Sequence, residues 1–445
     1  MNPNYKIIPD LHYQNCLTIP ANTAKQNKLL TEKKWFIRFG IQAVEIKLKI
    51  SSQLNENEIK LSIRLIDLLR IPLSGRYEIR LEDNEIRLGP YFGILAAAKK
   101  ETLNRIVHYL SNHLYNYDCI GGAVGAFSLE GINTSEQTME GYVYNPETGE
   151  WEQGIYSYPT ALFKIIYLNK QWRNHFQTVL GKRIFNSYVF NKWEMYKWFK
   201  EVPQLSSHLP ETMLYKSPED LESFLEKHST MYVKPVNGSM GIGVFKVSKT
   251  TAKFKVEFDE EGTSQVLLLS NIFDLADFFK SQFKDKKYIL QEAIKMISDK
   301  GQNIDFRIAM VKNEAGVWKE MIMVAKYGKS GSVVTNIKAG GSAELAEVTL
   351  KKMFGLSDEE VFRWRKDISQ LALKAVEHLE RVGIHCGNLG IDLAIDAETN
   401  IWIIEINNLN PDPLIALDVN NRQIFYQIKL MNMLYAKKLA GFGED

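Results

Sequence analysis

The sequence has few cysteines and no long apolar run. Three cysteines, Cys16, Cys119 and Cys386, occur among 445 residues, and they form no CxxC pair or Cys/His ligand spacing. This pattern excludes a disulfide framework and favours free thiols in a reducing cytoplasm. No run of about 18 apolar residues is present, and the first residues lack the charged start and apolar core of a signal peptide. We therefore expect a cytoplasmic protein that does not associate with a membrane.

The sequence also has no large excess of positive or negative charge. Lys and Arg number 55 against 53 Asp and Glu, so the net charge is +2, and no basic block stands out. We therefore expect no nucleic-acid partner. The aromatic run from Trp193 to Phe199 alternates with lysines, but at helical spacing it predicts a core face rather than a base-stacking surface. With 45% hydrophobic residues, the chain can bury the cores of two or three domains.

Hydropathy patterns divide the chain into three parts. Period-two alternation in 35–50 and 77–89 predicts a β-rich domain over residues 1–89. A strand, helix, strand pattern then predicts an α/β domain over 90–185, with a hairpin around 144–154. The third part, 186–440, carries helical patterns before and after a strand-rich region. We expect its helices at 191–201, 217–228, 357–383 and 421–438, and a β-hairpin at 388–406.

A glycine-rich loop follows a short strand that ends in Lys234. Its glycines at 238, 241 and 243 allow the backbone to turn and to approach phosphate oxygens closely, with the Lys234 charge beside them. The loop is neither a Walker loop nor a Rossmann fingerprint, because Lys precedes the glycines and a strand follows them. It suits a flap over the phosphates of a nucleotide. The alternative is a plain glycine-rich hairpin.

The C-terminal hairpin carries three oxygen donors on one face. Strand alternation places Asp392, Glu405 and Asn407 together, opposite an apolar face that includes Trp402, Ile404 and Ile406. If Asp396 opposes Ile401, then Asp392 lies directly across from Glu405. Two such carboxylates are unfavourable neighbours unless a cation lies between them, and Mg²⁺ accepts donors of this kind. A solvated acidic face is the alternative.

Three further segments lie between the loop and the hairpin. The strand at 288–294 ends in Gln291-Glu292, as an adenine-binding hinge would, although many strands end so. Arg307 could fork onto a phosphate, or could form a surface ion pair with Asp305. Asn336 precedes a double glycine and could face the phosphates or a metal, or could belong to an ordinary loop.

The order of these pieces resembles the ATP-grasp superfamily over about residues 185–420. The series runs from Lys192 and Lys234 through Gln291-Glu292, Asp305-Phe306-Arg307 and Asn336 to Asp392 and Glu405-Ile406-Asn407. More narrowly, it is similar to the YheC/YheD family of endospore coat-associated ATP-grasp proteins. Segments at 88–95, 183–186, 209–212 and 390–393 support this likeness.

The resemblance implies an α+β class with two α+β subdomains that sandwich ATP, preceded by the β-rich domain and an α/β pre-ATP-grasp domain. It implies Mg²⁺ at Asp392, Glu405 and Asn407, and catalytic roles for Arg307 and Lys326. The predicted ATP-binding residues are Lys192, Lys234, Gly238, Ser239, Met240, Gly241, Gln291, Glu292, Ile294 and Asn336.

The activity implied is an ADP-forming ligase that joins a carboxylate to an amine or thiol through an acyl phosphate. Its partners would be a small-molecule or peptide carboxylate and an amine or thiol acceptor, in the cytoplasm or at the forming endospore. Two alternatives are an ATP-dependent kinase and a spore coat-associated protein that binds nucleotide without turnover. The acceptor end departs from the family pattern, since Lys326 stands where many relatives carry Arg and the 408–413 segment differs.

Overall fold

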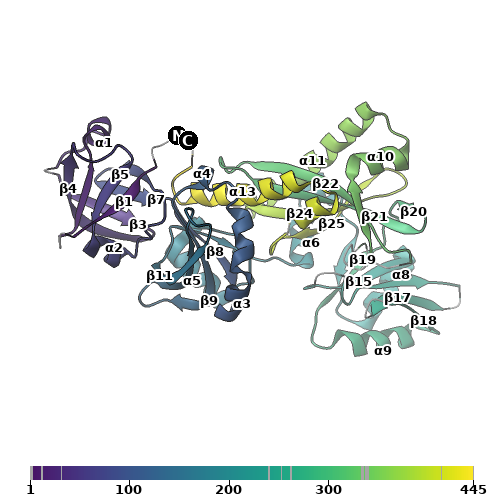
Figure 1. Ribbon diagram of the computed structural model, residues 1–445. Coiled ribbons are helices and arrows are strands. Elements are labelled where there is room, and N and C mark those ends of the chain that lie inside the picture. The colour runs from purple at the N-terminus through teal and green to yellow at the C-terminus, as the bar shows by residue number, and fades with distance from the viewer. Residues whose placement is uncertain are drawn as a thin grey trace.

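The computed structural model describes residues 4–11, 14–31, 33–238, 241–251, 253–260, 263–331, 335, 340–411 and 413–443. These residues form four β-sheets with helices between and beside them. Figure 1 shows the N-terminal sheet at one end of an elongated molecule, the second sheet in the middle and two sheets at the other end. The α+β class that the sequence predicts is confirmed.

The first sheet is mixed and has seven strands in the order β1-β5-β2-β4-β3-β7-β6. Strand β3 shows why it forms, because Trp35, Ile37 and Phe39 are buried while the residues between them are not. Such alternation presents one face to a core. The elements are β1 Lys6–Asp10, β2 Cys16–Pro20, α1 Ala21–Gln26, β3 Trp35–Phe39, β4 Gln42–Ser51, β5 Glu58–Ser62, α2 Ile63–Leu69, β6 Glu78–Glu82 and β7 Glu85–Gly89.

The second sheet follows the order β11-β10-β9-β8-β12-β13. Strands β8 and β9 pair in parallel across a helical connection, and β10 and β11 form an antiparallel hairpin, so both sequence predictions for this region are confirmed. The elements are β8 Tyr91–Ala97, α3 Lys100–Ile106, η1 Val107–His113, α4 Tyr117–Ile120, β9 Ala123–Asn133, β10 Thr138–Tyr144, β11 Trp151–Ser157, β12 Ala161–Lys164, α5 Lys170–Leu180, η2 Gly181–Arg183 and β13 Ile184–Phe185.

The third sheet is antiparallel, in the order β14-β19-β15-β16-β17-β18. Helices α8 and α9 pack against it through buried Leu and Phe side chains. Helix α8 begins with Pro218 after Ser217, whose N–H donates to the Asp220 carboxylate at 2.9 Å. The elements are α6 Lys192–Lys200, α7 Pro203–Ser206, β14 Thr212–Leu214, α8 Pro218–His228, β15 Thr230–Pro235, β16 Phe245–Lys249, β17 Phe254–Glu260, β18 Thr263–Leu269, α9 Ile272–Phe283 and β19 Tyr288–Glu292.

The fourth sheet has the order β23-β22-β21-β24-β25, with β20 beside β21. Its core also contains residues of α6, α7 and α11, and the buried aromatic residues of α6 confirm the predicted core face. The elements are β20 Ser298–Asp299, β21 Gln302–Lys312, β22 Trp318–Tyr327, β23 Ser342–Leu345, α10 Ala346–Phe354, α11 Asp358–Arg381, β24 Asn388–Ile395, β25 Ile401–Asn407, α12 Leu414–Asp418 and α13 Arg422–Leu439.

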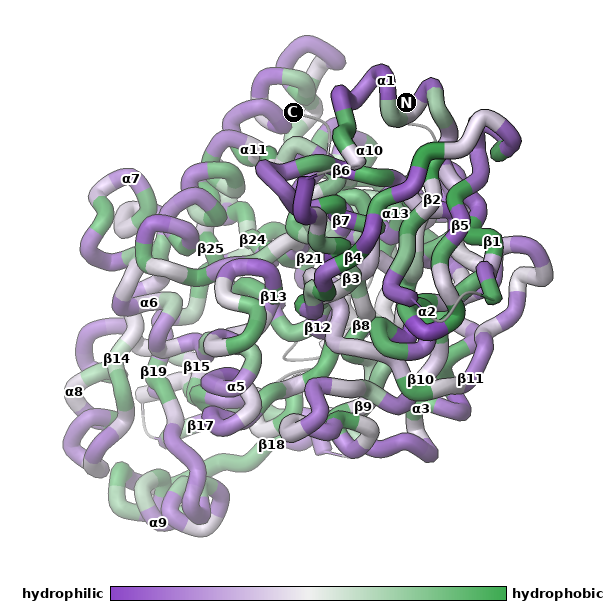
Figure 2. Tube along the Cα trace, turned by 90° about the vertical axis from the view of Figure 1, so that its left-hand side faces the viewer, coloured by the Kyte–Doolittle hydropathy of each residue, from purple (hydrophilic) through white to green (hydrophobic). Residues whose placement is uncertain are grey.

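Helix α11 is the longest of the described helices and is amphipathic. A capping box between Ser357 and Glu360 begins it, and Arg381 stands in its last turn, where a cation favours the helix dipole. Its outer turns are mostly hydrophilic in Figure 2. No helix among the described residues is long and apolar enough to cross a membrane.

Candidate functional site

The acidic hairpin forms as the sequence predicts, with one irregularity. Asp392 on β24 lies directly opposite Glu405 on β25, and Gly390 lies opposite Asn407, which confirms the predicted pairing of the two carboxylates. A bulge between Asp392 and Leu393 then shifts the register by one residue. The expected apolar face is therefore wrong in part, because Ile403 is fully buried whereas Ile404 is only half-buried.

Asp392 is surrounded by cationic donors from β21 and β22. Arg307 donates to both carboxylate oxygens, through Nε at 2.6 Å and an Nη at 2.8 Å, and Lys326 Nζ donates at 3.0 Å. The Asn407 amide donates to Asp392 Oδ2 at 2.9 Å. Burial favours the neutral acid, but Arg307 and Lys326 together outweigh it and hold the pKa of Asp392 well below its ordinary value.

Asp305 belongs to the same cluster, although the sequence offered it only as a surface partner of Arg307. The predicted surface ion pair is wrong, because Asp305 is buried and Arg307 pairs with Asp392 instead. Asp305 lies 3.1 Å from the Lys326 ammonium and accepts a hydrogen bond from Thr335. Burial raises the pKa of Asp305 to about 6, which the Asp392 charge reinforces and Lys326 opposes. Because side chains alternate along a strand, Asp305 and Arg307 lie on the same face of β21. This alternation is the sequence signal that could have placed Asp305 in the site.

Lys192 links the glycine loop to the hairpin. It is the first residue of α6, which begins at Asn191 with a capping box to Glu194. Its Nζ donates to the Gly238 carbonyl and to Glu405 Oε1, each at 2.9 Å. One ammonium therefore holds together two elements that the sequence assigned to phosphate and metal binding.

Asn408 fixes this arrangement and was missed in the sequence. The buried Asn408 side chain accepts from the Phe190 N–H at 3.1 Å and donates to the Phe190 carbonyl at 3.0 Å. It thereby attaches the chain just before α6 to the end of β25, which brings Lys192 to Glu405. No motif marked this residue, because its role depends on two segments far apart in sequence.

Lys234 lies at the end of β15 beneath the loop. Its Nζ donates to the Gln291 amide oxygen at 2.6 Å and lies 4.9 Å from the centre of the Tyr232 ring. Gln291 in turn donates to Thr212 Oγ1 at 3.0 Å. Burial lowers the pKa of Lys234 to about 8, against the opposing effect of Glu405, and nearby Lys192 lowers it further. Lys234 therefore titrates close to neutral pH.

The segment that the sequence predicts as an adenine-binding hinge lies at the end of β19. The Glu292 backbone N–H donates to the Glu211 carbonyl at 2.9 Å, and its carboxylate accepts from the Glu211 N–H at 3.1 Å. Ile294 follows, half-buried, and its carbonyl accepts from the Met296 N–H at 2.9 Å. The chain runs from this end of β19 into β20 and β21 of the fourth sheet, as Figure 1 shows.

The glycine loop is described in part. Gly238 is exposed, and Gly241 has a φ of 75°, a left-handed conformation that favours glycine. The predicted ligands Ser239, Met240 and Asn336 lie outside the described residues. The remaining predicted residues occupy two groups, one at Lys192, Lys234 and the hinge, and the other around Asp392.

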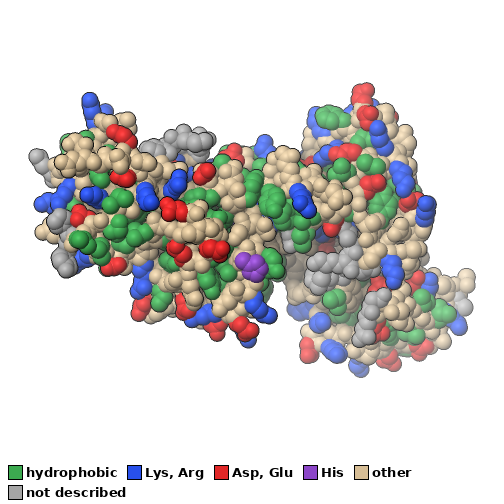
Figure 3. Space-filling model, in the orientation of Figure 1, with side chains coloured by type: hydrophobic (Ala, Val, Ile, Leu, Met, Phe, Trp, Pro, Cys, Tyr) green, Lys and Arg blue, Asp and Glu red, His purple; other side chains and the backbone are tan. Residues whose placement is uncertain are grey.

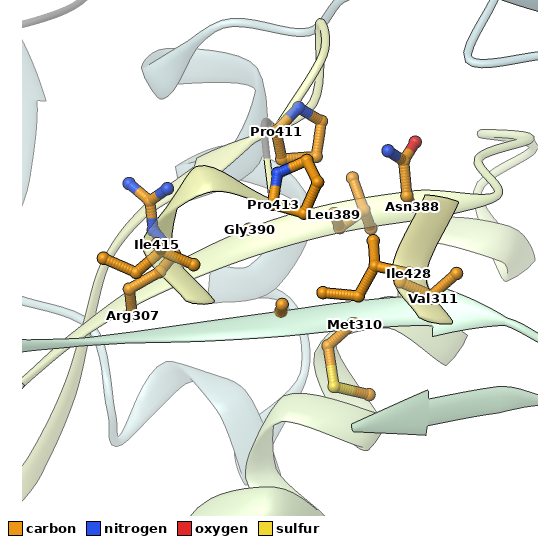
Figure 4. A pocket seen from close by; sticks show the side chains of 11 residues that line it. Arg307, Met310, Val311, Asn388, Leu389, Gly390, Pro411, Pro413, Ile415 and Ile428 are labelled. Carbon is orange, nitrogen blue, oxygen red and sulfur yellow. The ribbon is translucent and has the colours of Figure 1, made fainter. Parts of the chain in front are cut away.

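Gly390 lets Arg307 reach the hairpin. A Cβ at this position would lie 3.2 Å from Arg307 Cδ and 3.2 Å from Pro411 Cβ. Figure 4 shows Pro411 and Pro413 above strand β24 near Gly390. The cavity among these residues has a volume of about 10 Å³, which is close to the space for a single water molecule. It is therefore too small to hold a substrate.

The donor set fits Mg²⁺ in its chemistry. Asp392 and Glu405 place two carboxylates, which are hard oxygen donors, opposite each other. Asn407 faces Asp392 through its amide nitrogen, so its carboxamide oxygen would have to turn toward a metal. Among the described residues there is no group of three or more His, Cys, Asp or Glu side chains that could hold a metal. The predicted Mg²⁺ ligands therefore stay a prediction.

Comparison with known proteins identifies the family. The family model for YheC/D-like ATP-grasp proteins matches residues 181–439, which is more than half of the chain. The chain belongs to this family, and the ATP-grasp fold expected from the sequence is confirmed.

Two curated relatives come from Bacillus subtilis (strain 168). The chain is 26% identical to the endospore coat-associated protein YheD over 92% of this chain and 90% of that protein. It is 22% identical to the endospore coat-associated protein YheC over 49% of this chain and 59% of that protein.

Solved structures give weaker likenesses. The VanG D-Ala:D-Ser ligase from Enterococcus faecalis matches 79% of this chain and 98% of its own, with 12% identity and a TM-score of 0.46. The D-alanyl-alanine synthetase A from Vibrio cholerae matches 78% and 99%, with 10% identity and a TM-score of 0.43.

Proposed function

We propose that the protein is a Mg²⁺- and ATP-dependent ligase that joins a carboxylate to an amine or thiol and releases ADP and phosphate. The observation that carries this proposal is the bridge from Lys192 to both the Gly238 carbonyl and Glu405. It brings the glycine loop and the acidic hairpin to one ammonium. Such proximity suits a triphosphate that touches the loop with its oxygens and the hairpin through Mg²⁺.

The nucleotide would lie between the third and fourth sheets. Gln291, Glu292 and Ile294 would hold the adenosine at the end of β19, while Lys192, Lys234 and the loop from Gly238 to Gly241 would hold the phosphates. Lys192 donates a hydrogen bond to Glu405, and Lys234 donates one to Gln291. On binding, they would exchange these partners for phosphate oxygens, which are stronger acceptors for a cation.

Asp392, Glu405 and Asn407 would hold Mg²⁺, which neutralises phosphate charge and orients the γ-phosphate when bound. Asp392 stays ionised across the neutral range because Arg307 and Lys326 hold its pKa low. Those two cations would also lie beside the transferring phosphoryl group. They would stabilise the negative charge that develops on it.

The reaction then has two balanced steps. An oxygen of the substrate carboxylate attacks the γ-phosphorus, the bond from that phosphorus to the β–γ bridging oxygen breaks, and ADP leaves with the electron pair. The amine nitrogen or thiol sulfur attacks the carbonyl carbon of the acyl phosphate. The carbon–oxygen bond to phosphate breaks, phosphate departs, and the proton of the nucleophile passes to solvent.

A screen for ADP release across mixtures of carboxylates and amines tests this function. We expect ADP to appear with a carboxylate present and a hydroxamate to form when hydroxylamine replaces the amine. A kinase with a stable acceptor would release ADP without hydroxamate. AMP and pyrophosphate as products would contradict the proposed mechanism, and a binding protein without turnover would consume no ATP in a manner that depends on Glu405.

A further inference from the structure

A second polar cavity lies far from the acidic hairpin, where the first and second sheets meet. Its volume is about 80 Å³, and its lining comes from three parts of the chain that are distant in sequence. A single water needs about 10 to 15 Å³ of such space, so the cavity has room for a small organic anion. The lining residues are Arg38, Arg87, Leu88, Thr160, Arg183, Ala440 and Phe442.

Two of its arginines lie directly opposite each other. Arg38 on β3 and Arg87 on β7 are register partners, a pairing of like charges that is unfavourable by itself. The Glu85 carboxylate compensates for this repulsion. Arg38 donates two hydrogen bonds of 2.7 Å to the carboxylate, and Arg87 Nε donates a third at 3.0 Å. Arg87 also pairs with Glu82 at 2.6 Å. Two carboxylates therefore balance these two arginines.

Arg183 brings a third positive charge to the cavity. It donates to the carbonyls of Leu180 and Val179 at the end of α5, at 3.1 and 3.4 Å. No carboxylate among the described residues forms an ion pair with it. Burial lowers the pKa of Arg183, and the charges of Arg38 and Arg87 lower it further. The three lining arginines and the two glutamates that pair with Arg38 and Arg87 thus carry one positive charge in excess, and Arg80, the register partner of Arg87, adds a further positive charge nearby.

Three of the lining residues are apolar. Leu88 and Ala440 are buried, and Phe442 packs on the N-terminal sheet beside Gly89, where a Cβ would lie 2.4 Å from the ring. Arg80 lies over the same ring and donates to the Gly443 carbonyl. Figure 3 shows basic and acidic side chains intermingled on the surface over this junction.

We propose that this cavity binds a monocarboxylate with a short apolar substituent. The excess of positive charge matches a negative charge, the Arg183 guanidinium offers its charge to the carboxylate, and the apolar Leu88, Ala440 and Phe442 take the hydrocarbon. The cavity shares no residue with the nucleotide site. Binding there would connect the N-terminal sheet, the second sheet and the C-terminal segment through one ligand.

Calorimetric titration of the full chain tests this site in the absence of ATP and Mg²⁺. The probes are acetate, 3-methylbutanoate and inorganic phosphate, each against chloride at matched ionic strength. We expect saturable binding of 3-methylbutanoate that is tighter than that of acetate. Arg183→Gln and Arg87→Gln should each weaken it by about tenfold or more, the effect of losing one charged hydrogen bond.

Arg64→Gln is the matched control, because it removes the same charge from an exposed position in the same N-terminal unit. It should leave the affinity unchanged. Arg87→Gln separates ligand binding from loss of the α5 contacts, since Arg87 bonds Glu85 and Glu82 whereas Arg183 bonds the α5 carbonyls. Tighter binding of phosphate than of either carboxylate, equal affinity in all variants, or no saturable binding would overturn the proposal.

Discussion

Glu405 is the residue on which the proposed metal site depends most. Glu405→Gln removes a charge and little volume, so turnover should fall by at least about 10²-fold as electrostatic stabilisation is lost. The partly exposed pair with Lys192 contributes little to folding, and the free energy of unfolding should change by less than about 1 kcal/mol. Steady-state ADP release and thermal unfolding measure the two effects.

The exposed Glu398 in the turn of the same hairpin provides the control. Glu398→Gln should leave turnover unchanged. A large loss of stability in Glu405→Gln, with activity recovered at low temperature, would show instead that Glu405 is structural.

Lys234 should contribute to nucleotide affinity. In Lys234→Ala the charged donor beneath the loop is lost, and the dissociation constant for Mg-ATP should rise by about ten- to a hundredfold, as expected for a hydrogen bond from a charged group. Titration calorimetry measures it, with the exposed Lys249→Ala on the neighbouring strand as control. Equal affinity in both variants would exclude Lys234 from the phosphate site.

The pH dependence of ATP binding should follow the same side chain. The pKa of Lys234 is lowered to about 8 by burial, so the ammonium is lost as the pH rises above this value. Bound phosphate favours the charged form, and one pH unit above the pKa removes about nine-tenths of it. Affinity should therefore fall by about tenfold from pH 7 to pH 9 in the native chain and stay nearly flat in Lys234→Ala. If the ATP affinity of the native chain did not fall over this pH range, the assignment of Lys234 to the phosphate site would be contradicted.

At the scale of single elements, the β24–β25 hairpin shows what sequence alone can supply. Alternation placed Asp392 opposite Glu405 correctly, but the assumed register at the turn was wrong, because Ile401 pairs with Ile395 and not with Asp396. The bulge that reorients Ile403 and Ile404 was not predictable, because it depends on how β24 packs against β21 rather than on local pattern. The same limit applies to the partners of Arg307 and Lys326, which come from neighbouring strands.

Strand β12 contains a buried charge that should weaken the fold. Lys164 is fully buried, its Nζ has no hydrogen-bond partner in the described part of the chain, and burial lowers its pKa from 10.5 to about 8. Below pH 8 the folded chain must hold this ammonium away from water. Lys164→Met should therefore raise the free energy of unfolding by on the order of 3 kcal/mol at neutral pH, the equivalent of this pKa shift.

The sign of the pH effect makes this prediction specific. Between pH 8 and 10.5 the unfolded chain binds a proton at Lys164 that the folded chain lacks, so native stability rises with pH. The advantage of Lys164→Met should shrink over this window. Denaturant unfolding at several pH values measures it, with exposed Lys99→Met as control, and a gain that is independent of pH would contradict the stated cause.

At the scale of the whole molecule, divisions near residues 89 and 185 remain a proposal. The sequence located the β-rich, α/β and ATP-grasp parts by their patterns. It could not reveal that α13, at the end of the ATP-grasp segment, contributes Met433, Tyr435 and Ala436 to a core shared with the second sheet. Such long-range packing has no local signature, and it joins the ATP-grasp segment to the second sheet in one core.

The most direct test of the central claim follows one oxygen atom through the reaction. A carboxylate identified by the ADP screen is labelled with ¹⁸O and incubated with its acceptor and Mg-ATP. Mass spectrometry then measures the ¹⁸O content of the released phosphate. The acyl phosphate route predicts phosphate that carries one ¹⁸O atom, together with ADP. Unlabelled phosphate, or ¹⁸O in AMP with release of pyrophosphate, would contradict it.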